Sequence, residues 1–133
     1  MQSKSIATNT LLMPNIPSSF FNYPMALEHV RTKFDDFGIL YAFVAMKGFG
    51  RLMIIYEETA CAIKARDTVD NLILSWEERT MEDDSGIEVF NVSIDKEKPD
   101  SDRLCMKIRL YYGQVSYYYN INCTNYLTFC YAN

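Results

Sequence analysis

Residues 39–56 read Ile-Leu-Tyr-Ala-Phe-Val-Ala-Met-Lys-Gly-Phe-Gly-Arg-Leu-Met-Ile-Ile-Tyr, and this stretch decides the predicted fold. Two apolar runs, Ile39–Met46 and Arg51–Tyr56, flank the glycine-containing segment Lys47–Gly50. Apolar runs of this length around a glycine-rich turn are typical of paired strands. We therefore expect a β-hairpin, and the segments on either side of it predict what packs against it.

Those neighbouring segments predict one helix before the hairpin and one after it. In residues 23–37, apolar side chains recur at steps of three and four, which places them on one helix face. They are Leu27, Val30, Phe34 and Phe37. Gly38 suits the end of this helix. After the hairpin, Thr59 can cap a second helix that runs to about Asn71.

Further strands are expected near both ends of the chain. Thr10–Ile16 is a short apolar run in which Pro14 marks the strand end or a bulge. Met106–Tyr112 alternates, so Met106, Ile108 and Leu110 should face inward, and Lys107, Arg109 and Tyr111 outward. Leu72–Trp76 and Gly86–Ile94 are weaker strand candidates that would pair as an additional hairpin.

The element order β-α-β-β-α-insert-β predicts an α+β fold, the ferredoxin-like α/β sandwich of RNA-recognition motifs. Residues 8–114 would form this one domain after an N-terminal tail, 1–7, with an acidic insert, 77–102, before the last strand. Residues 115–133 carry no charge and hold five tyrosines, so we interpret them as an atypical tail outside the domain. An additional strand at the sheet edge is the alternative.

Charge and hydropathy limit the possible partners and compartments. The chain has 133 residues and a net charge of −4, but residues 77–102 alone carry ten acidic and three basic residues. We expect a solvated loop there, and the alternative is an acidic segment that folds back on a basic sheet. The sequence has neither an apolar run of about 20 residues nor a signal core, which predicts a cytoplasmic or nuclear protein without a membrane partner.

Catalytic and metal-binding patterns are missing, so we expect a protein that is not an enzyme and needs no cofactor or metal. None of the phosphate-loop, dinucleotide, zinc-protease or serine-hydrolase motifs occurs. The four cysteines form no C-x-x-C pair, and the chain has one histidine. We interpret Cys61 and Cys105 as small buried apolar residues.

The hairpin also carries part of the signature with which RNA-recognition motifs stack bases. Lys47–Gly50 matches the first four positions, but Arg51 stands where the second stacking ring should be, and the last position is Ile54. In the first strand, Leu12 occupies the stacking position. Because stacking contributes about 1–3 kcal/mol per base, the loss of two of three platforms favours protein contact over binding of single-stranded RNA, which remains the alternative.

Several segments resemble calcipressins, the regulators of the calcium- and calmodulin-dependent phosphatase calcineurin. The run Phe49–Arg66 resembles their third strand and second helix, Thr8–Phe21 resembles the fungal first strand and its exit, and Met106–Gln114 resembles the closing strand. The resemblance covers Thr8 to Gln114 and implies an RNA-recognition-like domain that acts by protein binding, with calcineurin as partner. The family's serine-proline segment and its docking segment do not occur in this sequence, so we expect no strong phosphatase inhibition.

The sheet face without helices is the candidate contact surface, because the predicted helices cover only the other face. The residues expected on it are Leu12, Phe49, Arg51, Met53, Lys107, Arg109 and Tyr111.

Overall fold

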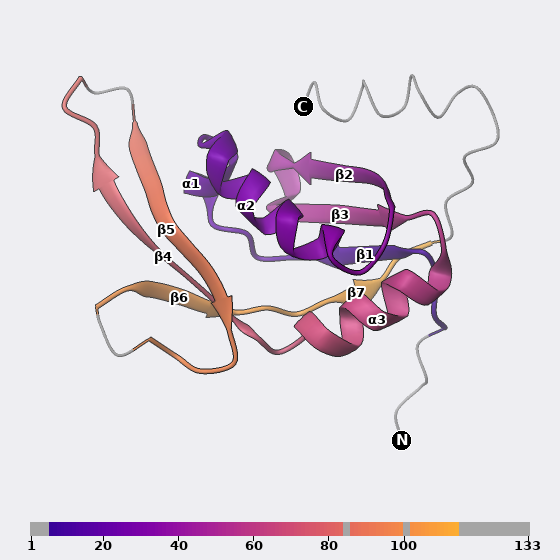
Figure 1. Cartoon of the computed structure of the whole chain (residues 1–133). Helices are drawn as coiled ribbons and strands as arrows, with labels where there is room; N and C mark the ends of the chain where they lie inside the picture. Colours follow the sequence, from indigo (N-terminus) through magenta and orange to yellow (C-terminus); the bar gives the residue numbers. More distant parts are fainter. Residues whose placement is uncertain (1–5, 84–85, 100–101, 115–133) are drawn as a thin grey trace.

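The computed structural model describes residues 6–83, 86–99 and 102–114, which form an α+β fold with two antiparallel sheets (Figure 1). The strands are β1 (Thr10–Met13), β2 (Leu40–Met46), β3 (Arg51–Tyr56), β4 (Ile73–Thr80), β5 (Ile87–Asp95), β6 (Leu104–Lys107) and β7 (Tyr111–Tyr112). The helices are α1 (Ser18–Phe21), α2 (Pro24–Asp35) and α3 (Thr59–Val69), with a 3₁₀ turn, η1 (Lys47–Phe49). No helix in these ranges has the length and apolarity needed to cross a membrane.

The first sheet has four strands in the order β2-β3-β1-β7. The expected hairpin of β2 and β3 is confirmed, and η1 forms its turn. At the end of η1, Gly50 adopts a left-handed backbone conformation with φ of 62°, which glycine reaches without steric cost. The first strand ends at Met13, directly before Pro14, as the missing N–H of proline predicts.

Helices α2 and α3 lie on one face of this sheet (Figure 1). Val30 and Phe34 of α2 are buried in the same cluster as Leu11 of β1 and Ile54 of β3, which confirms the predicted helix face. The Tyr56 hydroxyl donates a hydrogen bond of 2.6 Å to the carbonyl oxygen of Phe34. Burial raises the pKa of Tyr56 well above its usual range.

The acidic segment is folded, so the expectation of a solvated loop there is wrong for much of it. Strands β4 and β5 form the additional hairpin, which projects from the body of the molecule and joins β6 in a second sheet of order β5-β4-β6 (Figure 1). This sheet packs against α1, where the rings of Phe20 and Trp76 meet edge to face at 5.2 Å. The Glu78 carboxylate accepts hydrogen bonds from the Ser19 hydroxyl at 2.6 Å and the Trp76 indole N–H at 2.8 Å.

Two carboxylates of this sheet pair with nearby arginines. Arg103 pairs with Glu77 at 3.2 Å, and Arg79 pairs with Glu88 at 2.6 Å. The Arg79–Glu88 hydrogen bond also raises the pKa of Arg79. These pairings neutralise acidic groups locally and do not support an insert that folds back on the first sheet.

The expected closing strand, Met106–Tyr112, is not continuous, and this prediction is corrected. Strand β6 pairs with β4 in the second sheet, whereas β7 pairs with β1 in the first. Ile108 and Leu110 between them are fully buried, as the alternation predicts, but their backbone groups bond outside any ladder. The Ile108 N–H donates to the Leu72 carbonyl at 2.7 Å, and Arg66 Nε donates to the Leu110 carbonyl at 2.9 Å.

The expected burial of Cys105 is wrong, and the expected tails lie outside the described residues. Cys105 is exposed on β6 rather than buried, while Cys61 is partly buried on α3. Residues 115–133, interpreted from sequence as a tail, lie outside the described residues, as do residues 1–5 of the expected N-terminal tail.

Candidate functional site

The face of the first sheet that points away from α2 and α3 is called the outer face here, and it contains four of the predicted contact residues. Leu11 and Met13 are buried in the cluster that includes helix residues, so Leu12 between them points to the outer face. The same alternation sends Arg51 and Met53 of β3 outward, because Leu52 lies in the helix-covered core. The fourth is Tyr111 of β7.

A row of apolar side chains crosses all four strands of the outer face. In register, Val44 lies opposite Met53, Met53 opposite Leu12, and Leu12 opposite Tyr111. Neighbouring strands lie about 4.8 Å apart, so the row spans roughly 14 Å. Three of its four side chains are aliphatic, and Tyr111 is 48% exposed. Val44 is fully buried, so a partner would meet Met53, Leu12 and Tyr111 of this row.

A second small core lies beneath this row. None of its buried residues is among the contact residues predicted from the sequence. Ala42, Val44 and Ile55 form a buried cluster separate from the helix-covered core, and partly buried side chains pack against it. These are Tyr41, Met46 and Met53. The register of the β2–β3 hairpin could have revealed Val44 and Ile55. It pairs Val44 with Met53 and Ile55 with Ala42.

One end of the outer face carries a cation beside an exposed ring. Arg51 lies opposite Met46 in register, where β2 and β3 leave the turn. Its guanidinium carbon lies 6.0 Å from the centre of the Phe49 ring, and Phe49 is 75% exposed. A guanidinium plane near an aromatic face can hold a planar anion and an apolar group together.

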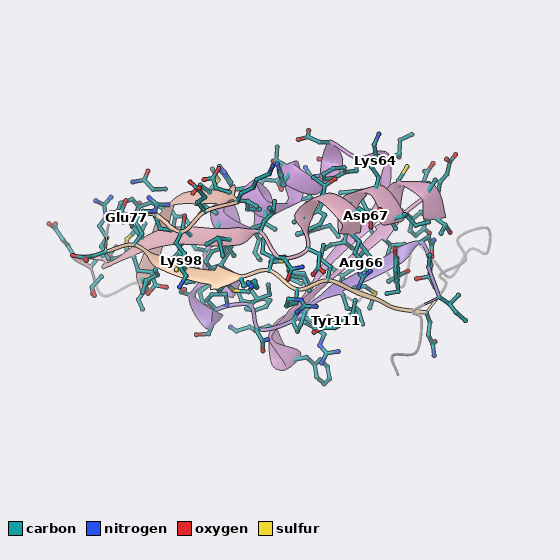
Figure 2. The ribbon with its side chains drawn as sticks, turned by 90° about the horizontal axis from the view of Figure 1, so that it is seen from below. Lys64, Arg66, Asp67, Glu77, Lys98 and Tyr111 are labelled. Atoms are coloured by element: carbon teal, nitrogen blue, oxygen red, sulfur yellow. The ribbon has the colours of Figure 1, made fainter. Side chains whose placement is uncertain are left out.

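The opposite end of the face is organised around Tyr111 on the edge strand β7. Arg66 lies on the α3 side of this strand and Tyr111 on the other side (Figure 2). The Arg109 guanidinium carbon lies 5.8 Å from the centre of the Tyr111 ring, and Arg109 Nε donates to the Asp70 carboxylate at 3.3 Å. Asp70 therefore offsets the charge of Arg109.

Lys107 does not join the site, contrary to its expected place on the same strand as Tyr111. It lies in β6, opposite Ile73 of β4, and thus belongs to the second sheet. The outward direction of its side chain is as expected, since Lys107 is exposed. What the alternation could not show is that the chain changes sheets directly after this residue.

No protein-family model matches the chain, and no curated protein matches it significantly.

A separate apolar hollow lies on the helix side of the edge strand β2. Its lining includes Phe21 and Leu27 from the helices and Phe43 from β2. The charged groups at its rim already have partners in this chain. Arg31 pairs with Glu28 at 2.5 Å and with Asp35 at 3.1 Å, and the hydrogen bond from Arg31 lowers the pKa of Glu28. This hollow therefore offers a partner fewer unsatisfied polar side chains than the outer face does.

The outer face can bind a partner through non-covalent contacts. Its apolar row can bury aliphatic or aromatic surface, and Arg51 can hold an anion. Within residues 6–83, 86–99 and 102–114, there is no group of three or more His, Cys, Asp or Glu side chains that could hold a metal ion.

Proposed function

We propose that this protein is a non-enzymatic protein-binding domain of the RNA-recognition-like, ferredoxin-like type, acting in the cytosol or nucleus. The strand order β2-β3-β1-β7, with α2 and α3 on one face, supports this arrangement. The resemblance to calcipressins makes calcineurin the expected partner. The observation that carries the proposal is the aliphatic row across the outer face, where base-stacking rings would be needed for RNA.

The side chains of the outer face favour a protein over a nucleic acid as the partner. Burial of apolar surface contributes roughly 25 cal/mol per Å², so the partly exposed side chains of Met53, Leu12 and Tyr111 gain by docking against apolar groups of a partner. Base stacking needs rings, and Leu12 and Met53 lie at the centre of the face. Phosphate contacts through Arg51 alone would be weak and sensitive to salt.

The test is a binding titration of the full chain with purified calcineurin, using isothermal calorimetry in the presence of calcium and calmodulin. We expect Leu12→Asp and Tyr111→Asp each to weaken binding at least about tenfold, because each places a carboxylate where a docked partner would bury it. The matched control is Ile87→Asp, which introduces the same charge at a 45% exposed apolar residue of the β4–β5 hairpin. Thermal unfolding of each variant verifies that it is folded.

Two outcomes would reject this function. The first is no binding of the unmodified chain, and the second is equal weakening by Ile87→Asp and by the two outer-face variants. Tyr111→Asp keeps the test decisive if Leu12→Asp does not fold, because Tyr111 is 48% exposed and its replacement removes little packing.

Binding of single-stranded RNA is the second candidate, and the exposed Phe49 ring beside Arg51 is the observation that favours it. A titration with single-stranded RNA at physiological salt, with Arg51→Ala as control, separates the two functions. Micromolar, sequence-preferring binding that Arg51→Ala abolishes would favour RNA. Binding that disappears with added salt and shows no sequence preference would reflect charge alone.

A further inference from the structure

The two edges of the first sheet differ in length. The strand order β2-β3-β1-β7 makes β2 and β7 the edges, and β2 has seven residues whereas β7 has two (Figure 1). An edge strand presents a row of unpaired N–H and C=O groups, to which another extended chain can bond. Strand β2 is therefore the longer template for an added strand.

The hydrogen-bond pattern of β3 shows which of its residues bond to each neighbouring strand. The Tyr56 N–H donates to the carbonyl oxygen of Asn9, directly before β1, at 2.8 Å. Successive residues of an antiparallel strand direct their backbone groups to opposite sides. Ile54 therefore also bonds to β1, whereas Ile55 and Met53 bond to β2.

The same alternation identifies the residues of β2 that direct their backbone groups out of the sheet. Val44 lies opposite Met53 and bonds to it. Its neighbour Phe43, and Ala45 on its other side, therefore direct their N–H and C=O groups to the free edge. In the part of the chain that the structure describes, no strand pairs with this side of β2.

The apolar hollow on the helix side of β2 lies along these outward backbone groups. Its volume is about 350 Å³, and Phe43 and Ala45 are the apolar residues that line it from β2. Residues of one stripe of α2 line it from the other side, and these are Pro24, Leu27, Glu28 and Arg31. Side chains directly opposite each other on paired strands share a face. A strand added to β2 would therefore direct every second side chain into this hollow.

The lining of the hollow determines which side chains the added strand needs. Phe21, Leu27 and Phe43 make it mainly apolar. Lys47, which directly follows β2, is exposed and lines the same hollow. Its Nζ atom donates to the neutral side-chain oxygen of Asn22 at 3.0 Å, and no carboxylate of the described residues forms an ion pair with it. A complementary strand carries apolar side chains and an acidic one at the Lys47 end.

We propose that the edge of β2 is a further protein-contact site, which takes an extended segment of a partner protein as an added antiparallel strand. Antiparallel pairing is the more stable arrangement per residue. It places an acidic residue at the start of the segment beside Lys47, and apolar residues two and four positions later opposite Ala45 and Phe43. Backbone hydrogen bonds give the affinity, and the hollow and Lys47 select the sequence. This site is separate from the outer face and does not depend on calcineurin.

The probe is the capped hexapeptide acetyl-Glu-Thr-Leu-Thr-Leu-Thr-amide, titrated into the nitrogen-15-labelled full chain. The measurement is hydrogen exchange at single amides. In the free protein, the Phe43 and Ala45 amides should exchange faster than the Val44 amide, which bonds to β3. Saturating peptide should slow exchange at Phe43 and Ala45 and leave that of Val44 unchanged, because only the outward amides gain an acceptor.

Matched peptides separate an added strand from general apolar contact. N-methylation of both leucines removes the N–H groups that face β2 and should weaken binding at least about tenfold. N-methylation of the first two threonines alters groups that point away from β2 and should weaken binding less than about threefold. The glutamine analogue should bind about threefold more weakly, since an exposed ion pair contributes little.

Three variants test the protein side of the contact. Ala45→Pro removes an outward N–H at a sheet edge, where proline is tolerated, and should weaken peptide binding at least about tenfold. Lys47→Gln should weaken binding of the glutamate peptide about threefold and leave that of the glutamine analogue unchanged. The matched control is Lys64→Gln, at an exposed lysine of α3, which should change neither affinity. If Ala45→Pro does not fold, the methylated peptides still decide the question.

Four results would overturn the inference. Two of them are equal binding of the two methylated peptides and no change in exchange at millimolar peptide. A dimer of the free chain in analytical ultracentrifugation that Ala45→Pro dissociates would assign the edge to a second copy. Slow exchange of the Phe43 and Ala45 amides in a free monomer would mean that another part of this chain already pairs with β2. Failure of calcineurin to bind would reject the proposed function of the outer face and leave this inference standing.

Discussion

Leu12 in β1 lies directly opposite Met53 in β3, and both side chains stand on the face of the sheet away from α2 and α3. Leu11, the neighbour of Leu12, is fully buried under the helices. Consecutive residues of one strand therefore serve different purposes. Leu11 packs between the two layers, and Leu12 is partly exposed on the outer face.

This division predicts a contrast between two alanine substitutions. Leu11→Ala should lower the free energy of unfolding by about 2–5 kcal/mol, because it leaves a cavity in the helix-covered core. Leu12→Ala removes partly exposed surface and should cost about 1 kcal/mol or less. Urea unfolding of both variants measures the difference. Equal costs would mean that the two faces are packed alike.

Gly38 and Cys61 are in unusually close contact. A Cβ atom at Gly38 would lie 2.3 Å from Cys61 Sγ, and the φ of Gly38 is +151°. Gly38→Ala should therefore destabilise the protein by about 2–4 kcal/mol, through steric overlap and backbone strain. Thermal unfolding measures the loss.

The control for this substitution is Gly48→Ala in η1, where an added Cβ meets nothing within 4 Å. Gly48→Ala should leave the midpoint temperature of thermal unfolding nearly unchanged. Cys61→Ala in the Gly38→Ala background should recover part of the loss, since it removes the sulfur that the new methyl group meets. A cost of Gly38→Ala that Cys61→Ala does not reduce would show that overlap with the sulfur is not the cause of the loss.

Tyr56 predicts an alkaline limit to stability. Burial raises its pKa in the folded state above the value of about 10 in an unfolded chain. Below about pH 10 both states keep the proton, so the contribution of Tyr56 is fully present. Above that pH the unfolded state loses the proton first, and the free energy of unfolding falls by up to about 1.4 kcal/mol per pH unit from this group.

The variant that isolates this effect is Tyr56→Phe, which also loses the hydrogen bond to the Phe34 carbonyl. At neutral pH it should be less stable by about 1 kcal/mol. The difference in free energy of unfolding between the two proteins should narrow as the pH rises above about 10, because only the unmodified protein carries the titrating group. Urea unfolding across this range is the measurement. A difference that stays constant with pH would show that folding does not raise the pKa of Tyr56.

Asp70 should control the crossing of the chain between the sheets. Its Oδ1 atom accepts the Leu110 N–H at 2.8 Å, at the point where β6 has ended and β7 has not begun. Asp70→Ala should cost about 1–2 kcal/mol and speed hydrogen exchange at the Leu110 amide, because that amide loses its acceptor. Asp70→Asn keeps an acceptor and should slow the exchange again.

The control here is Arg109→Ala, which removes the partly exposed partner of Asp70 at 3.3 Å and the guanidinium beside Tyr111, but keeps the Asp70 carboxylate. It should change the free energy of unfolding by less than about 1 kcal/mol and leave the exchange of Leu110 slow. Fast exchange in this variant would mean that the ion pair, not the carboxylate itself, orders the crossing.

The candidate site was accessible from sequence where a single strand or hairpin defines it. The stacking positions of the RNA-recognition signature predicted Leu12 and Arg51 on the helix-free face, and in the structure their neighbours Leu11 and Leu52 are buried in the helix-covered core. Val44 and Ile55 were missed although the hairpin register pairs them with outer-face residues. Lys107 was assigned to the wrong sheet, because its exposure is the same in either sheet.

The sequence by itself determined the hairpin, both long helices and the inward or outward direction of residues 106–111. These features depend on local geometry, since side chains alternate along a strand and recur every three to four residues in a helix. Only the tertiary structure decided how strands beyond the two hairpins pair, and so the separate second sheet and the division of residues 104–112 between two sheets. Alternation records the face of a residue but not its backbone partner, and the partner depends on chain segments far apart in sequence.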